Sequence, residues 1–387
     1  MKKHIKLFIV LGIILVGSFS FYLFEGYKKD ALVYENNKIM PSSSGIAMML
    51  ETSAGSGNYE MTTRSEWPTE GYVFNANLSK CENGSELSWD NENKKVLMSG
   101  NKSDKCYVYF DVYVKQRFDQ SCNDNTLACH TAKLYTGTQG ANNIYYHDAN
   151  LTNGAGDNSY RYAGADVKNY ICLGSSEATC PDDNLYRIIG VFGDDNHGVS
   201  GQQLVKVIKN TSYGIYEWST SNSSDWATAS LKITLNSTFI TEKLSGFEDK
   251  IAEVTWRVSG YSTSAATAKT VYTGEITNAT KTYTAKIGLI YPSDYGYATT
   301  PDYWTTNVYD YNTAASSKDW LFLGSYEWLL SPGSGDFNGA WNVNSSGRAY
   351  NNGGVVYASA VRPSFYLLSS VKYVSGSGTS SLPIRIN

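Results

Sequence analysis

The chain has 387 residues, a formal net charge of −4 and only 18% charged residues. It is long enough for two domains of ordinary size, and its weakly acidic balance excludes the basic surface that nucleic-acid binding requires. The composition includes 31 Tyr residues together with much Asn, Ser, Thr and Gly. It is typical of β-rich extracellular proteins and binding loops, although an AT-rich genome would favour the same residues.

Residues 1–29 predict a cytoplasmic tip and a membrane anchor. Lys2, Lys3 and Lys6 precede an uncharged run over 7–24 in which Leu, Ile, Val and Phe dominate. At about 1.5 Å per residue the run is roughly 27 Å long, enough to cross the hydrocarbon core. The lysines favour an N-terminus inside the cell. A cleaved secretory signal is the alternative, and both interpretations place the body outside the cytoplasm.

The exported body is predicted to be β-rich, of the α+β class, with a stalk over 30–45 and a small β-sandwich-like module over 46–115. Residues 71–74, 95–98 and 106–113 are rich in β-branched and aromatic residues, which predicts strands. Residues 116–183 carry many Gly, Asn and Asp and predict a loop-rich, disulfide-stapled connection. The remainder, 184–387, predicts a second domain with a hairpin over 185–209, helices over 226–244 and further strands near 285–290, 341–343, 354–357 and 365–368.

The six cysteines predict three local disulfides, because they fall as three neighbouring couples in an exported chain. The predicted bonds are Cys81–Cys106, Cys122–Cys129 and Cys172–Cys180. A metal site would need closely spaced groups of thiolates, which the sequence lacks.

Residues 184–387 carry motifs in a specific order. These are Tyr186-Arg187-Ile188-Ile189-Gly190, Trp328-Leu329-Leu330-Ser331-Pro332, Ala340-Trp341-Asn342-Val343 and Val361-Arg362-Pro363. In this order they resemble a domain family common in exported proteins of Firmicutes and Mollicutes-like gut bacteria. That family is similar to the C-type-lectin-like fold in the variant used by the formylglycine-generating-enzyme superfamily.

The resemblance implies a compact α+β domain whose long loops present a variable surface. It does not imply the enzyme's activity, because that activity uses a copper-binding cysteine pair and residues 181–387 contain no cysteine. Trp328, Trp341 and Arg362 are expected to be scaffold: large rings that pin loops to a core, and a structural cation against a carboxylate or carbonyls. Pro332 and Pro363 complete this motif set.

Catalytic signatures are missing from the sequence, so we expect no catalytic residues, no metal site and no cofactor. His147 and His197 lie in predicted loops and are expected to be solvated. Residues 148–154 only faintly match a calcium loop. Asp310, Asp319 and Glu327 could supply a glycosidase pair, but nothing in the sequence sets their separation.

The leading functional hypothesis is a membrane-anchored binding or adhesion protein at the cell surface, which recognises a glycan or a surface protein. Polar and aromatic loops on a rigid frame are how such folds recognise ligands. The expected ligand-binding residues are Asp336, Asn338, Tyr350, Asn351, Asn352 and Tyr357. A structural or assembly component of the envelope is the alternative, and a cell-wall hydrolase is the third possibility.

Overall fold

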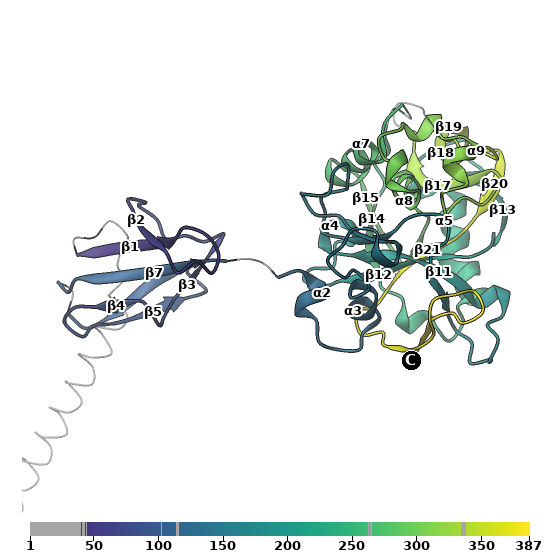
Figure 1. The fold of residues 1–387 in the computed structure, drawn as a ribbon. Coiled ribbons are helices and arrows are strands. Elements are labelled where there is room, and N and C mark those ends of the chain that lie inside the picture. The colour runs from purple at the N-terminus through teal and green to yellow at the C-terminus, as the bar shows by residue number, and fades with distance from the viewer. Residues whose placement is uncertain are drawn as a thin grey trace, which may run out of the picture. The chain divides into compact units, whose positions relative to one another are not determined.

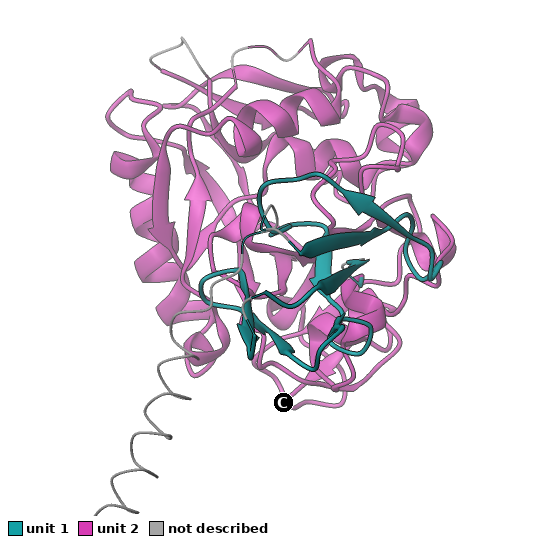
Figure 2. Ribbon diagram, turned by 90° about the vertical axis from the view of Figure 1, so that its left-hand side faces the viewer, with its two compact units in different colours: residues 1–116 teal, residues 117–387 magenta. Residues whose placement is uncertain are grey.

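The computed structural model describes residues 40, 43, 45–101, 103–113, 116–261, 263, 265–333 and 338–387. The predicted anchor and nearly all of the predicted stalk lie outside these residues. Within the described part, no helix is both long and apolar enough to cross a membrane. The chain divides into two compact units, Met1–Gln116 and Arg117–Asn387, coloured separately in Figure 2.

The first unit is built from short strands. A sheet has the order β2-β1-β7-β3, β4 also pairs with β7, and β5 and β6 form a separate hairpin. The strands are β1 (Ile46–Glu51), β2 (Tyr59–Thr62), β3 (Tyr72–Phe74), β4 (Lys80–Cys81), β5 (Glu86–Asp90), β6 (Lys95–Ser99) and β7 (Cys106–Val112). Strands β1 and β7 are parallel, while the other pairs in this unit are antiparallel.

The core of the first unit is small. Alternate residues of β1 and β7, such as Met48 and Val108, face one side of the sheet and pack with Val96 and Met98 of the hairpin. Trp67 and Phe110 complete this cluster with two aromatic rings. So few buried side chains give limited hydrophobic stabilisation, which makes the disulfide of this unit important.

The second unit contains two larger sheets (Figure 1). The first has the order β16-β21-β12-β11-β9-β8, with β10 also paired to β11. Its strands are β8 (Ile144–Tyr146), β9 (Tyr160–Tyr162), β10 (Tyr170–Cys172), β11 (Leu185–Phe192), β12 (Leu204–Lys209), β16 (Ile287–Gly288) and β21 (Ser364–Leu367). Every residue of β11 and β12 is buried, which is expected of central strands covered on both faces.

The second sheet has the order β13-β20-β17-β18-β19. Its strands are β13 (Gly214–Glu217), β17 (Glu327–Pro332), β18 (Gly339–Val343), β19 (Ala349–Gly354) and β20 (Ala358–Val361). Strands β17 and β18 are buried throughout, whereas β19 forms one edge and exposes part of its length. Two small ribbons are formed by β14 (Val254–Arg257) with β15 (Thr282–Ala285), and by β22 (Tyr373–Ser375) with β23 (Arg385–Ile386).

The helices are short and lie between the strands. They are α2 (Phe118–Ser121), α3 (Leu127–Ala132), α4 (Asp194–His197), α5 (Ser230–Thr234), α6 (Ile240–Lys243), α7 (Ala268–Tyr272), α8 (Pro292–Ala298) and α9 (Thr313–Ser316). Single helical turns are η1 (Ala141–Asn143), η2 (Asp182–Asn184), η3 (Trp226–Thr228), η4 (Leu235–Phe239), η5 (Glu248–Lys250), η6 (Thr273–Thr277), η7 (Pro301–Tyr303) and η8 (Val308–Asp310). The whole is therefore β-rich with few helices, as the sequence predicts.

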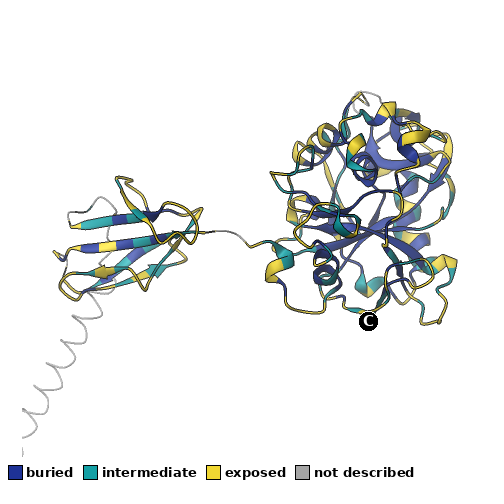
Figure 3. Ribbon diagram, in the orientation of Figure 1, coloured by how far each residue is buried: buried dark blue, intermediate teal, exposed yellow. Residues whose placement is uncertain are grey.

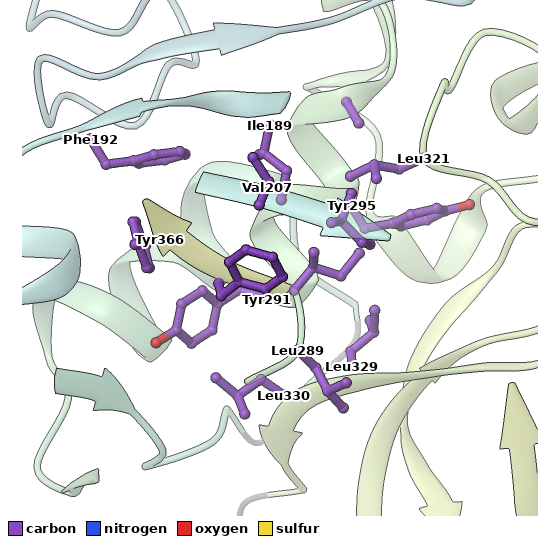
Figure 4. Packing of buried hydrophobic residues seen from close by; sticks show 14 of the residues in the cluster. Ile189, Phe192, Val207, Leu289, Tyr291, Tyr295, Leu321, Leu329, Leu330 and Tyr366 are labelled. Carbon is purple, nitrogen blue, oxygen red and sulfur yellow. The ribbon is translucent and has the colours of Figure 1, made fainter. Parts of the chain in front are cut away.

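One continuous core holds the second unit together. The buried strands of both sheets stand out in Figure 3, and Figure 4 shows side chains from both sheets meeting around α8. Val207 and Tyr366 come from the first sheet, Leu329 and Leu330 from the second, and Tyr295 from α8.

Residues 116–183 correct the expectation of a loop-rich connection between domains. The segment from Arg117 onward belongs to the second unit, and its strands β8, β9 and β10 extend the same sheet as β11. Gly190 shows why the packing is so close, because a side chain there would collide with the carbonyl oxygen of Tyr160. Strands of three residues among Gly and Asn carry too weak a periodic pattern to be predicted from sequence.

The three predicted disulfides are confirmed: Cys81–Cys106, Cys122–Cys129 and Cys172–Cys180. Cys81 and Cys106 are directly opposite each other on β4 and β7, so their bond staples the sheet of the first unit. The third bond lies against the C-terminal ribbon, where the Arg385 guanidinium donates to Cys172 Sγ and to three carbonyl groups within residues 175–178.

Replacing both Cys81 and Cys106 by Ser should destabilise the first unit by about 3.5 kcal/mol, the loop-closure value for a separation of 25 residues. The small core has little other stabilisation to offset that loss. Calorimetry of residues 30–387 should show the transition of the first unit moving to lower temperature while that of the second stays in place. Equal melting of this unit with and without the bond would contradict the prediction.

Candidate functional site

Two buried tryptophans form the floor of the region that the sequence singles out. Trp328 is on β17 and donates its indole N–H to the Tyr216 carbonyl at 2.9 Å. Trp341 is on β18 and donates to the Tyr261 carbonyl at 3.1 Å. Both rings are fully buried, so each combines a large apolar contact with a satisfied polar group. This is the scaffold arrangement expected of them.

Arg362 fixes the strand next to this floor. It is buried and forms a bidentate pair with Glu327 of β17, at 2.7 Å from Nε to Oε1 and 2.8 Å from Nη2 to Oε2. Its Nη2 also donates to the Leu321 carbonyl. Pro363 follows at once and leads into β21. Arg362 therefore has both partners expected of a structural cation, a carboxylate and a carbonyl.

Glycine allows β19 to lie close to the floor. A side chain at Gly353 would lie 2.8 Å from the Asn342 amide nitrogen and 2.9 Å from the Trp328 ring. The Asn342 amide donates to the Tyr350 hydroxyl at 3.3 Å, which positions this phenol over the same face. Burial raises the pKa of Tyr350, so its hydroxyl remains a neutral donor and acceptor.

The structure places most of the expected ligand-binding residues on β19 and in the turn that follows it. Tyr350, Asn351 and Asn352 lie on the edge strand β19, and Tyr357 lies in the turn between β19 and β20. The Asn338 carbonyl accepts from the Val355 backbone N–H, so Asn338 lies beside that turn. Asp336 lies outside the described residues.

Tyr326 belongs to the same region and was missed by sequence reasoning. It directly precedes β17, is 50% exposed, and its carbonyl accepts from the Ala360 backbone N–H. Its hydroxyl is also close enough to affect the pKa of Tyr350. We call Tyr326, Tyr350 and Tyr357 the tyrosine face; Tyr357 is the most exposed, at 73%. An aromatic residue directly before a buried strand was the available signal.

A buried ion network lies at the N-terminus of α8. The Asp294 carboxylate accepts from Lys206 Nζ at 2.6 Å and from Arg161 Nη1 at 3.2 Å. Arg161 also pairs with Asp157 at 2.6 Å, so two cations face two carboxylates. Burial alone would raise the pKa of Asp157, but the charge of Arg161 outweighs it and holds that pKa well below its usual range.

Glu275 is a further buried carboxyl group close to Asp294 of this network. Its Oε1 accepts from the Ser293 backbone N–H and its Oε2 from the Ser331 hydroxyl, both at 3.0 Å. Burial, with a further contribution from Asp294, raises the pKa of Glu275 from 4.5 to about 7. No cation forms an ion pair with it among the described residues.

His147 and His197 correct the expectation of solvated loop histidines. Both side chains are completely buried. His147 accepts from the Ala155 backbone N–H, and burial lowers its pKa to about 3. His197 bonds to the Phe192 carbonyl through Nε2, and burial lowers its pKa as well. The loops fold back onto aromatic rings, which a local sequence pattern does not reveal.

The carboxylates considered for a hydrolase do not line an open cleft together. Asp319 and Glu327 are buried around Arg362, and burial raises the pKa of Asp319 well above its usual range. Asp310 is exposed and accepts from the Asn307 amide. The described residues also contain no group of three His, Cys, Asp or Glu side chains placed to hold a metal ion.

Comparisons with protein-family models, curated proteins and solved structures found no match to this chain. The resemblance to the exported-protein family and to the C-type-lectin-like fold therefore stays a prediction. What the structure adds is a sheet with two buried tryptophans and with the exposed Tyr326 and Tyr357 directly before strands β17 and β20.

Trp328→Ala and Trp341→Ala should each destabilise the second unit by about 3–5 kcal/mol, because each removes a fully buried ring. Asn352→Ala should melt like the parent, since this side chain is exposed on the edge strand. Thermal unfolding of the three variants tests this. Parent-like melting of both tryptophan variants would show that the floor is not needed for folding.

Glu275→Gln should change the pH dependence of stability. The unfolded chain releases this proton near pH 4.5 and the folded protein holds it to about pH 7, so a rising pH between these values favours unfolding. The ionised side chain costs on the order of 3 kcal/mol above this range. Gln mimics the protonated form, so the variant should gain stability relative to the parent as pH rises from 5 to 8.

The matched control is Glu253→Gln, at an exposed position of the same unit. Chemical denaturation at several pH values gives the stability difference from the parent directly. This difference should stay constant for the control and rise for Glu275→Gln. Parallel profiles for the parent and Glu275→Gln would show that Glu275 titrates normally.

Proposed function

We propose that this protein is a membrane-anchored, extracytoplasmic binding protein whose tyrosine face recognises a glycan or a surface protein. The observation that carries the proposal is the exposure of Tyr326 and Tyr357, with the half-buried Tyr350 beside them, at the N-terminal ends of β17, β20 and β19 in a sheet whose strands β17 and β18 are fully buried. Tyrosine supplies contact area and a hydrogen-bonding hydroxyl at low entropic cost, and a rigid frame keeps that area in place.

Export is supported by the disulfides. Three bonds use all six cysteines, and such bonds persist in oxidising compartments outside the cytoplasm. The apolar run over residues 7–24 supports a tether at the membrane. Together these features favour display of the two units at the cell surface.

The scaffold proposal is a small β-sandwich-like first unit and a C-type-lectin-like second unit. The first is supported by a sheet and a hairpin that share one core. The second is supported by the ordered motif set, by two sheets with short helices, and by loops that carry exposed polar and aromatic residues. In such a scaffold the strands provide rigidity and the loops provide specificity.

A glycan array with the exported body tests the function. The double variant Tyr326→Ala/Tyr357→Ala should lose at least about tenfold in signal, equivalent to about 1.4 kcal/mol of binding free energy. Both side chains are exposed, so folding should be unchanged. The control is Val374→Ala, which removes a 59% exposed side chain from β22, a strand outside this sheet.

A pull-down from an envelope fraction tests whether the ligand is a surface protein. If the array is blank and a surface protein is captured by the parent and the control but not by the double variant, the ligand is a protein. If the double variant keeps every interaction of the parent, the tyrosine face is not the recognition surface and the proposal fails.

A further inference from the structure

The buried cations of the second unit differ in whether a carboxylate lies close enough to pair with them. Five cationic side chains are buried among the described residues, and four of them lie within 4 Å of a carboxylate: Arg161, Lys206, Lys209 and Arg362. Arg187 is the fifth, and no described carboxylate lies within that distance of it. Because burying a charge without a counter-ion is costly, an unpaired buried guanidinium calls for an explanation.

Arg187 is held in a defined orientation. It lies on β11 with its Nε donating to the Asn169 side-chain oxygen at 2.5 Å, and the Asn169 amide is itself tied to the Ile188 carbonyl at 2.7 Å. The guanidinium carbon lies 3.9 Å from the centre of the Tyr170 ring and 4.8 Å from that of the Trp320 ring. Trp320 is fixed in turn by donating to the Tyr162 carbonyl.

The terminal nitrogens of this guanidinium form no hydrogen bond with a described group. Neither is among the fully buried unpaired atoms, so Nη1 and Nη2 reach the surface, and a guanidinium carries five N–H donors. The residue keeps 8% exposure. Nε is already bonded to Asn169, whereas Nη1 and Nη2 are not bonded to any described group. The Nη1–Nη2 edge of the guanidinium can therefore donate to an incoming acceptor.

The electrostatic surroundings favour an anion. Burial, with a smaller contribution from the charge of Arg362, lowers the pKa of Arg187 to about 10. The two aromatic rings offset part of this cost through cation–π attraction. No described carboxylate neutralises the guanidinium, so it still attracts negative charge.

We propose that Arg187 anchors a binding site for the carboxylate of a small acidic ligand. A planar carboxylate accepts two parallel N–H bonds from a guanidinium edge, and the fixed Nε presets that edge. The wall beside Tyr170 comes from the glycine-rich tail: the Gly378 carbonyl accepts from the Tyr170 backbone N–H, and a side chain at Gly378 would meet the Lys168 carbonyl at 2.4 Å. This site is independent of the tyrosine face.

Thermal unfolding of the full chain with acetate, sodium D-glucuronate, sulfate or chloride at equal ionic strength tests the proposal. Acetate and glucuronate should raise the melting temperature of the parent above its value in chloride, since a ligand that binds only the folded state stabilises it. D-Glucose, which lacks the carboxylate, should have no effect. Arg187→Gln should lower the apparent affinity for acetate by about tenfold or more.

Arg348→Gln is the matched control, because it removes the same charge from an exposed position of the same unit. It should keep the response to acetate. If Arg187→Gln fails to fold, an NMR titration of the parent with acetate tests the same proposal. The side-chain N–H signal of Arg187 should shift, and those of Arg161 and Arg362 should not. No carboxylate effect on the parent, an equal effect on Arg187→Gln, or stronger stabilisation by sulfate than by acetate would overturn the proposal.

Discussion

The carboxylate of Asp294 is the interaction on which the second unit depends. It caps the first turn of α8 by accepting from the Tyr291 backbone N–H, and it binds Lys206 of β12 and Arg161 of β9. One side chain thus joins a helix to two strands of the first sheet. With Asp157, the set balances two positive and two negative charges, which is what makes so deep an ion network tolerable.

The same helix turn reaches the second sheet through Glu275. That side chain accepts from Ser293 of α8 and from Ser331 of β17, and β17 also carries Trp328 and Glu327. The frame therefore runs from the ion network through α8 to the strand that supports the tyrosine face. Strand β17 is held by buried hydrogen bonds as well as by apolar packing. The packing fixes the geometry of the bonds, and the bonds fix the position of the packed side chains.

The first unit relies on a different constraint. It lacks such a network among its described residues and has a small core, so the Cys81–Cys106 bond limits the unfolded chain instead. Arg187 shows the opposite case inside the second unit. There a charge is buried against aromatic rings and left without a carboxylate, at a place where the surrounding bonds already hold it still.

The sequence by itself determined features that local spacing and residue type control. The three disulfides follow from neighbouring cysteines, and strands β3, β6, β7, β11 and β12 follow from runs of β-branched and aromatic residues. The buried roles of Trp328, Trp341 and Arg362 follow from their chemistry. Only the tertiary structure decided the rest. The burial of His147 and His197, the joining of 117–183 to the second unit, and the partners of Asp294 and Arg187 all depend on residues distant in sequence. Contacts between distant residues leave no periodic pattern in the chain, so the fold had to bring them together before their roles became visible.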